Sequence, residues 1–317
     1  DGKDYISISQ VIFTIKKIKE YVRKYVDGND IVIVYSQPWM NLGTITELKK
    51  KDILPIMEIE EFHADNNRLG KLKRLTYRYI EKRSVESSSH FIVSSEIIAE
   101  IIGKKSVICH GPYTPTKAIP KNIISPIKIL YSGSIDIERG VFLFLDALKQ
   151  LPNMLKREIE ITITGYFHGR NQRKLKDFFG KKIIHLRENG INCSFLGVVP
   201  EDRLSEVIQD AHICIAPQLI ENPFSSVCFP SKILKYLSFG KVVVSSALPS
   251  VIKSPFAEYM IIYDKDDPNV LANVLVKTVG ELNDFYTLKS YEIIELLEKL
   301  SIRFRKDLKD LIMEGHE

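Results

Sequence analysis

The sequence predicts an α/β protein with two doubly wound, Rossmann-like domains facing across a cleft. Short β-branched strands alternate with amphipathic helices at intervals of roughly 15 to 30 residues, as in βαβ units. A proline-rich segment interrupts this alternation near the middle of the chain, and proline withholds the backbone donor that a sheet interior needs. The length of 317 residues also exceeds what a single hydrophobic core usually organises.

The domain boundaries follow from this order. Residues 1–112 form the predicted N-terminal domain, residues 113–127 the linker, and residues 128–285 the C-terminal domain. The C-terminal helix, residues 286–317, is a candidate addition to the N-terminal domain. That domain looks shortened at its start, because residues 1–30 lack the strand and glycine-rich turn that usually open a doubly wound domain.

Each element is predicted from its periodicity and its flanking residues. In the N-terminal domain we expect helices at Phe13–Tyr25, Leu69–Ser87 and Glu96–Ile102, and strands at Ile31–Tyr35, Leu54–Ile59, His90–Val93 and Ser106–Cys109. In the C-terminal domain we expect strands at Lys128–Tyr131, Ile159–Thr164, Cys193–Leu196, Ile213–Ala216 and Val242–Ser245. Its expected helices are Val141–Leu148, Arg173–Phe179, Glu201–Gln209 and Ser231–Phe239, followed by a helical tail at Tyr286–Met313.

Composition excludes several classes of protein. Apolar residues make up 44% and charged residues 27%, as in a soluble globular protein. No apolar run approaches the roughly 18 residues that span a bilayer, and the first residues lack a signal-peptide pattern. We therefore expect a cytoplasmic protein. The net charge of +5 is modest and no nucleic-acid motif accompanies it, so a nucleic-acid partner is not expected. The four cysteines form no CxxC pair, so a metal site is not expected either.

The first strand of the C-terminal domain ends in a candidate phosphate site. Gly133 lies in the turn after this strand, and Arg139 stands just before the next helix. Open α/β sheets bind ligands beyond the carboxyl ends of their strands, glycine permits a close backbone approach, and arginine matches phosphate oxygens. The alternative is that Arg139 merely decorates the helix N-terminus.

A second candidate lies where Pro230, Ser231 and Lys232 open a helix that ends at Gly240. Ser231 is a suitable N-cap, and the first-turn amides favour an anion. Lys232 places a positive charge where the helix dipole disfavours it unless an anion is present. The alternative is an ordinary capped helix with a surface lysine.

Five segments within about residues 54–265 carry a family resemblance. They are YIEKRSVESSSHFIVSSEIIAEII, SGSIDIERG, ITGYF, SFLGVVPEDRLSEVIQDAHICIAPQ and FPSKILKYLSFGKVVVSS. In this order they resemble glycosyltransferase family 4 and its relatives, which are GT-B enzymes of bacterial polysaccharide and glycan assembly.

The resemblance implies a donor substrate that is a UDP- or GDP-linked sugar, with no further cofactor and no metal. It implies that the nucleoside lies next to Gly165, Phe167, Gly197 and Val198. It also implies that Arg139 and the helix start at Pro230, Ser231 and Lys232 meet the diphosphate. Transfer with retention of configuration, to a glycan or lipid-linked acceptor, follows from the same resemblance.

Two positions depart from the family pattern. Ser134 follows Gly133 where the family usually has arginine, which removes one expected cation. Lys235 occupies the position of a glutamate that the resemblance assigns to the donor ribose, and lysine cannot accept a hydroxyl proton. Glu221 and Asn222, in the preceding loop, are candidate substitutes.

An acidic cluster follows the second strand of the N-terminal domain. Glu58 and Glu60 point to one face of a strand, and like charges at this spacing raise one another's pKa. Glu61 and His63 are the candidates for orienting the acceptor hydroxyl. The alternative is a solvated acidic strand end.

The helix at residues 68–87 is strongly basic and has apolar residues at helical spacing. Such a helix suits peripheral contact with an anionic membrane, here the inner face of the cell membrane. A solvated basic face over an ordinary core contact is the alternative.

These features together predict a glycosyltransferase in bacterial surface polysaccharide biosynthesis. A GT-B-fold nucleotide-sugar epimerase is one alternative. A catalytically inactive GT-B partner subunit is the other, suggested by Ser134, Lys235 and the short first domain.

Overall fold

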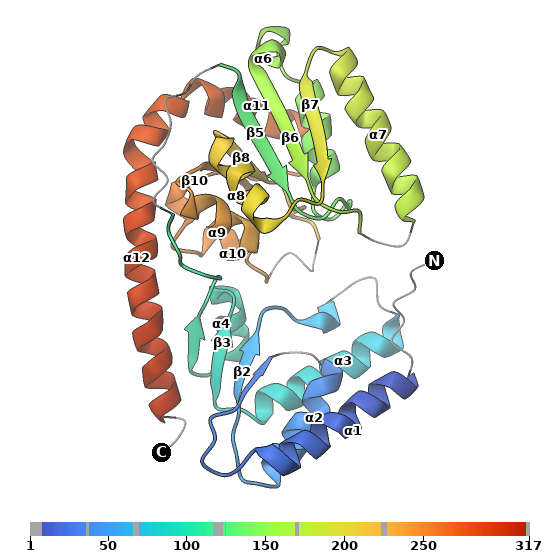
Figure 1. The fold of residues 1–317 in the computed structure, drawn as a ribbon, viewed down its shortest axis with the longest axis vertical. Helices are drawn as coiled ribbons and strands as arrows, with labels where there is room; N and C mark the ends of the chain where they lie inside the picture. The colour runs from blue at the N-terminus through green and yellow to red at the C-terminus, as the bar shows by residue number, and fades with distance from the viewer. Residues whose placement is uncertain are drawn as a thin grey trace. The chain divides into compact units, whose positions relative to one another are not determined.

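The computed structural model describes residues 8–35, 38–65, 70–116, 123, 125–168, 171–222 and 227–314. The chain divides into two compact units: residues 1–110 with 302–317 form unit 1, and residues 111–301 form unit 2. Each unit contains one parallel sheet with helices connecting its strands (Figure 1). The predicted pair of Rossmann-like α/β domains is therefore confirmed.

The sheet of unit 1 has the parallel strand order β1-β2-β3-β4. The strands are β1 (Ile33–Tyr35), β2 (Ile56–Ile59), β3 (His90–Val93) and β4 (Ser106–Ile108). The helices are α1 (Ile8–Tyr25), α2 (Pro38–Lys49), the short 3-10 helix η1 (His63–Asp65), α3 (Lys71–Glu86) and α4 (Glu96–Ile102). Figure 1 shows α1, α2 and α3 side by side within this unit.

The long C-terminal helix, α12 (Leu282–Glu314), contributes to both units, since its residues from Ile302 onward belong to unit 1. Leu311, near its end, is fully buried against Ile56, Ile92 and Val107 of the unit 1 sheet. This apolar contact fixes the last turns of α12 to the sheet.

The sheet of unit 2 has the parallel order β10-β9-β8-β5-β6-β7. Its strands are β5 (Ile127–Ser132), β6 (Ile159–Thr164), β7 (Asn192–Gly197), β8 (Ile213–Ala216), β9 (Val242–Ser246) and β10 (Met260–Tyr263). Its helices are α5 (Val141–Lys149), α6 (Asn153–Glu158), α7 (Gln172–Glu188), α8 (Glu201–Asp210), α9 (Ser231–Ser238), α10 (Pro249–Ile252), η3 (Ala257–Tyr259) and α11 (Pro268–Gly280).

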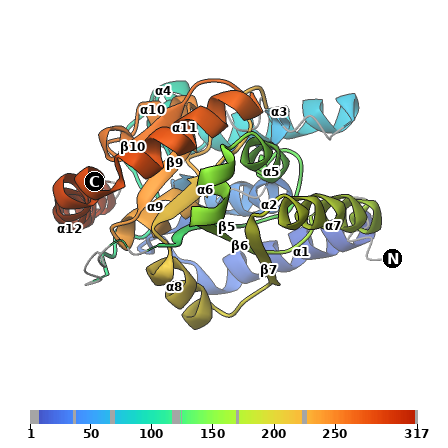
Figure 2. The same cartoon turned by 90° about the horizontal axis from the view of Figure 1, so that it is seen from above.

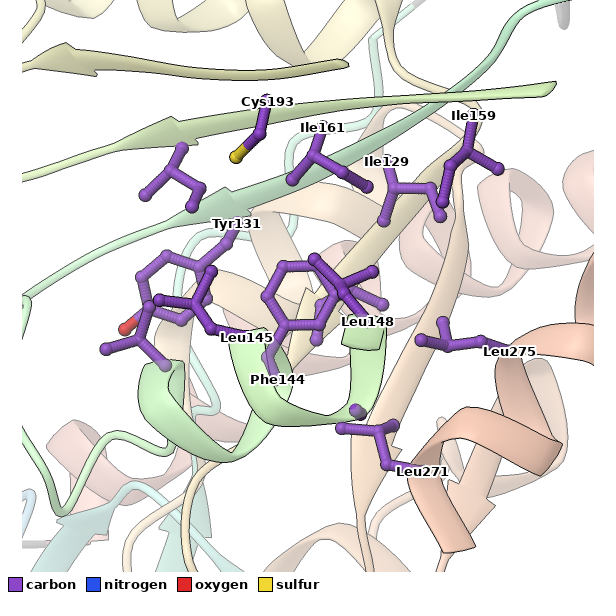
Figure 3. Close-up of a cluster of buried hydrophobic side chains, with 14 of the residues drawn as sticks. Ile129, Tyr131, Phe144, Leu145, Leu148, Ile159, Ile161, Cys193, Leu271 and Leu275 are labelled. Carbon is purple, nitrogen blue, oxygen red and sulfur yellow. The ribbon is translucent and has the colours of Figure 1, made fainter. Parts of the chain in front are cut away.

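The main core of unit 2 lies between the sheet and helices α5, α7 and α11. Phe144, Leu145 and Leu148 of α5 pack on Ile129 and Ile161 of the strands (Figure 3). Figure 2 shows α5 and α11 on one side of the strands and α8 on the other. Every residue of β8 and β9 is buried, as expected of central strands covered on both faces. Strand β6, which like β9 lies next to an edge strand, has half-buried residues at Glu160 and Thr162 and is otherwise buried.

Several elements were not predicted from the sequence. They are α2, α6, α10, β10 and α11. The apolar residues of α2 do not gather on one face, so helical periodicity gives no signal there. Among the described residues, no helix is both long enough and apolar enough to cross a membrane.

Candidate functional site

Three glycines end three neighbouring strands of unit 2 and form the floor of the site. Gly133 donates its backbone N–H to Thr164 O (3.1 Å), and Gly165 donates to Gly197 O (2.7 Å). A Cβ atom on Gly165 would lie 1.8 Å from Gly133 O, and φ at Gly165 is +139°. No side chain fits this position, so the ends of β5 and β6 approach each other by backbone alone.

The first turn of α9 brings Lys232 to this floor. Its Nζ lies 2.8 Å from the point that a Cβ atom on Gly133 would occupy, and 4.3 Å from the centre of the Tyr131 ring. Burial, followed by the nearby Arg139 charge, lowers the pKa of Lys232 to about 7, and Asp136 partly opposes this shift. Lys232 is thus half-buried beside this turn rather than fully exposed.

Arg139 lies in the turn between β5 and α5. Its backbone N–H donates to Asp136 Oδ1 (2.7 Å), and its Nη1 donates to Gln218 Oε1 (3.1 Å). Because Arg139 helps to lower the pKa of Lys232, the two cations repel each other across the turn. An anion placed between them would relieve that repulsion. The structure thus brings together Gly133, Arg139 and Lys232, as the sequence predicted.

Two buried tyrosines hold the turn in place. Tyr131 donates its hydroxyl to Ser134 O (2.7 Å), while the hydroxyl of Tyr236 accepts from the N–H of Ser132 (2.9 Å). Burial raises the pKa of both phenols well above the usual value, so they remain protonated. Tyr131 and Tyr236 were not predicted from the sequence, because a tyrosine at a strand end or in a helix is typical of an ordinary core residue. Asp136 was not predicted either.

A cavity of about 740 Å³ adjoins the glycine floor at the ends of β6 and β7. Its lining includes the predicted nucleoside residues Gly165, Phe167, Gly197 and Val198. Phe179 and Phe195, also in the lining, have ring centroids 5.5 and 5.6 Å from that of Phe167. Edge-to-face rings around a cavity of this size suit a planar aromatic base. Phe179 and Phe195 were not predicted, since their spacing is that of core residues.

The start of α9 differs from the prediction in one respect. Pro230 is the N-cap residue, Ser231 is the first helical residue, and no side chain caps the helix. The expectation that Ser231 acts as N-cap is therefore wrong. Pro230 already has the extended backbone that a cap position needs, so the helix begins at Ser231, one residue earlier than a cap at Ser231 would allow.

Lys235 forms an ion pair with Glu201 of α8. Its ammonium is therefore occupied by a neighbouring helix, while Lys232, one turn earlier, approaches Gly133. At Ser134, the backbone carbonyl accepts the Tyr131 hydroxyl. Lys235 therefore has an ion-pair partner outside the turn, whereas the contact at Ser134 involves only its backbone.

The loop after β8 is tied to the Arg139 turn. Leu219 donates its N–H to Glu138 O (3.1 Å). Asp266, which follows β10, accepts from the N–H groups of Ile220 (2.9 Å) and Glu221 (3.1 Å). This places the candidate residues Glu221 and Asn222 in a loop held close to the cations, although residues 223–226 lie outside the described part of the chain. The contact of Asp266 with this loop was not predicted, because the two are far apart in the sequence.

The acidic cluster of unit 1 surrounds the end of β2. Burial raises the pKa of Glu58, and the charge of Glu60 adds a smaller contribution. Tyr35 donates its hydroxyl to Glu60 Oε2 (2.7 Å), and this bond is the largest cause that raises the pKa of Tyr35 to about 12. The alternative of a fully solvated strand end is therefore wrong for Glu58.

Glu61 and His63 lie together, with 3.4 Å between Glu61 Oε1 and His63 Nδ1. The buried carboxylate of Glu81, on α3, accepts the backbone N–H of His63 (2.6 Å) and of Ala64 (3.3 Å). Glu81 thereby fixes the segment that carries the pair. This role of Glu81 was not predicted from the sequence. The signal that could have indicated it is an isolated acidic residue on a strongly basic helix. Among the described residues, no cluster of three or more acidic, histidine or cysteine side chains is arranged to hold a metal.

Comparison with known proteins finds similarity to glycosyltransferases. Residues 126–280 match the family model for glycosyl transferases group 1. A lipopolysaccharide 1,2-N-acetylglucosaminetransferase of Salmonella typhimurium is 25% identical over 230 residues, covering 67% of this chain and 59% of the relative. The chain thus matches less than two thirds of the length of this relative.

Solved structures share the fold of the whole chain. A sucrose-phosphate synthase from Thermosynechococcus elongatus has a TM-score of 0.73 at 14% identity, covering 98% of this chain and 80% of that one. An α,α-trehalose-phosphate synthase (UDP-forming) from Burkholderia xenovorans has a TM-score of 0.71 at 9% identity, covering 95% of this chain and 76% of that one. The chain therefore has the fold of the GT-B glycosyltransferases, and its residues 126–280 carry the sequence pattern of glycosyl transferases group 1.

Proposed function

We propose that the chain is a glycosyltransferase that moves a sugar from a nucleoside-diphosphate sugar to a glycan or lipid-linked acceptor. The observation that carries the proposal is the approach of Lys232 Nζ to within 2.8 Å of the Cβ position at Gly133, beside Arg139. A diphosphate placed there would have its nucleoside directed toward the cavity at Gly165 and Phe167. The similarity to a lipopolysaccharide N-acetylglucosaminetransferase supports a role in bacterial surface polysaccharide biosynthesis.

The proposed chemistry uses charge stabilisation. The bond between the anomeric carbon and the diphosphate oxygen breaks, and the acceptor oxygen bonds to the same carbon. The proton of the acceptor hydroxyl passes to the departing diphosphate, so the products are the glycosylated acceptor and a nucleoside diphosphate. Negative charge develops on the departing diphosphate, and fixed cations in a partly buried site stabilise it. We assign this function to Arg139 and Lys232, with the backbone N–H groups of Ser231 and Lys232 as additional donors.

The remaining features of the proposal come from the resemblance and from unit 1. We propose a UDP- or GDP-linked donor, no cofactor, retention of configuration and no requirement for a metal, with the cytoplasm as the predicted location. On the acceptor side, the Glu61–His63 pair offers both an acceptor and a donor for a hydroxyl group. Glu81 would preserve the geometry of that pair.

The test is a calorimetric titration with UDP-, GDP- and CMP-sugars, followed by product analysis with and without a glycan acceptor. The proposal expects one nucleotide class to bind and sugar to be transferred only when acceptor is present. Binding without transfer to any acceptor, with the sugar converted to its epimer, would identify an epimerase. Failure of every nucleotide to bind would favour an inactive partner subunit.

A further inference from the structure

Gln218 lies beside the candidate site and contacts one of its two cations. It follows β8 and Pro217 in the chain, and its Oε1 accepts a hydrogen bond from Arg139 Nη1 (3.1 Å). Gln218 is only 4% exposed, so its amide group is shielded from water. A buried polar group needs hydrogen bonds that compensate for its desolvation. The bond with Arg139 supplies part of that compensation.

The loop that carries Gln218 is fixed to the turn that carries Arg139. No side chain fits at Gly140, the residue after Arg139, because a Cβ atom there would overlap Pro217 O. The two backbones therefore meet directly. From another side, the Ser246 hydroxyl at the end of β9 donates to Gln218 O (2.6 Å), and Ser246 is fully buried. The main chain at Gln218 thus has a fixed position relative to the Arg139 turn.

The amide of Gln218 restricts a side chain that has many rotamers. Arginine has a long flexible stem that ends in a planar guanidinium group with several N–H donors. The bond at Nη1 sets the direction of that plane and leaves other N–H groups of Arg139 able to reach phosphate oxygens. Orientation before binding lowers the entropic cost of forming the complex and of reaching the transition state.

The acceptor on Gln218 is neutral, and neutrality matters for an anionic ligand. A carboxylate in the same place would pair with the guanidinium and offset the charge that it offers to a diphosphate. The buried carboxylate of Asp136 instead accepts the backbone N–H of Arg139 (2.7 Å). The guanidinium and this carboxylate therefore have separate hydrogen-bond partners.

We propose that Gln218 is a positioning residue for sugar transfer, which orients the Arg139 guanidinium toward the departing diphosphate and leaves its charge undiminished. The proposal rests on the proposed function, because it needs a diphosphate at Arg139. Gln218 acts through Arg139 and takes no part in the bond changes. If its amide only stabilised the loop, the effect of removing it would not depend on Arg139, and this difference can be measured.

The first experiment is a double-mutant cycle on steady-state sugar transfer. Gln218→Leu removes the acceptor at similar side-chain size and should lower kcat/KM about tenfold. In the Arg139→Ala background the same substitution should have almost no further effect, since the group that it positions is gone. Equal losses in the two backgrounds would overturn the proposal in favour of a structural role. Gln209→Leu, at an exposed position of α8, is the matched control and should retain the native kcat/KM.

The second experiment tests the neutrality of the acceptor with Gln218→Glu, which keeps the size of the side chain. The new carboxylate should weaken binding of the donor nucleotide sugar about tenfold at pH 7, because it offsets the charge of Arg139. It should also raise the pKa of Lys232 above its native value of about 7. Donor affinity should then begin to fall at a higher pH than in the native chain. Native affinity, or an unchanged pH profile, would overturn the proposal.

Urea unfolding of each variant separates a loss of positioning from a loss of folding. Gln218→Asn, which withdraws the amide by one methylene group, takes the place of Gln218→Leu in the cycle if the leucine variant does not fold. A native chain that transfers no sugar would refute the proposed function itself. A native chain that transfers sugar, together with an equally active Gln218→Leu variant, would refute only the role of Gln218.

Discussion

The lowered pKa of Lys232 predicts that the protein takes up a proton when it binds a nucleoside-diphosphate sugar. Burial lowers this pKa to about 7, against about 10.4 for a free lysine. At pH 8 the amine of the unliganded protein is therefore about one tenth protonated. A diphosphate beside it favours the charged form and raises the pKa again. We predict that a nucleoside-diphosphate sugar binds at pH 8 with uptake of about 0.9 proton.

The direction of the pH dependence follows from the same shift. Below pH 7 Lys232 is already charged, so affinity is almost constant. Above pH 7 the proton must be acquired on binding, and affinity falls about tenfold for each pH unit until the pKa of the complex is reached. The intact donor is the correct ligand for this assay, because its two phosphates remain fully ionised throughout the range.

The assay is isothermal titration calorimetry at pH 8 in two buffers that differ in ionisation enthalpy. The change in observed enthalpy between buffers measures proton uptake. Lys232→Arg keeps a permanent charge and should bind with almost no uptake, whereas Lys277→Met, at a site 72% exposed on α11, should match the native chain. A native uptake near zero at pH 8, or an unchanged uptake in Lys232→Arg, would refute the reasoning.

Three further predictions concern the same site. Arg139→Ala should lower kcat/KM at least about 30-fold, equivalent to about 2 kcal/mol of transition-state stabilisation, and an unchanged steady-state rate would remove Arg139 from the mechanism. Gly165→Ala should lower the free energy of unfolding, measured in urea, by more than Gly197→Ala does. A Cβ atom at Gly165 would lie 1.8 Å from Gly133 O, whereas a Cβ atom at Gly197 would meet nothing within 4 Å. Equal losses of unfolding free energy would contradict the close approach of the strand ends. Phe167→Ala should weaken donor binding about tenfold, because contact with the base is lost. Phe178 is half-exposed and lies outside the cavity lining, so Phe178→Ala should leave donor binding unchanged. Similar dissociation constants for both variants would argue against the cavity as the base site.

The positions of Gly133, Arg139 and Lys232 were predictable because they depend on local sequence and on one property of parallel sheets. Strands of such a sheet end at the same edge, so residues that follow different strands meet there. The alternation of strands and helices was sufficient to establish that edge. The four residues that the resemblance assigns to the nucleoside, Gly165, Phe167, Gly197 and Val198, line one cavity, and their assignment to the nucleoside stays a prediction.

Contacts between separate helices were not predictable in this way. The pairing of Lys235 with Glu201 depends on how α8 packs beside α9. The bonds from Asp266 to the loop after β8 depend on the end of β10, a strand that was missed. On α3, helical spacing identified an apolar stripe but did not reveal which side of the helix faces the core. These outcomes are set by tertiary packing, which periodicity does not encode.

The central claim is that a diphosphate binds between the turn at Gly133 and the first turn of α9. A crystal structure with an intact nucleoside-diphosphate sugar tests it most directly. The account predicts phosphate oxygens within hydrogen-bonding distance of Lys232 Nζ and the Arg139 guanidinium, with the base among the rings of Phe167, Phe179 and Phe195. A nucleotide bound elsewhere in unit 2, with both cations left without a phosphate, would contradict it.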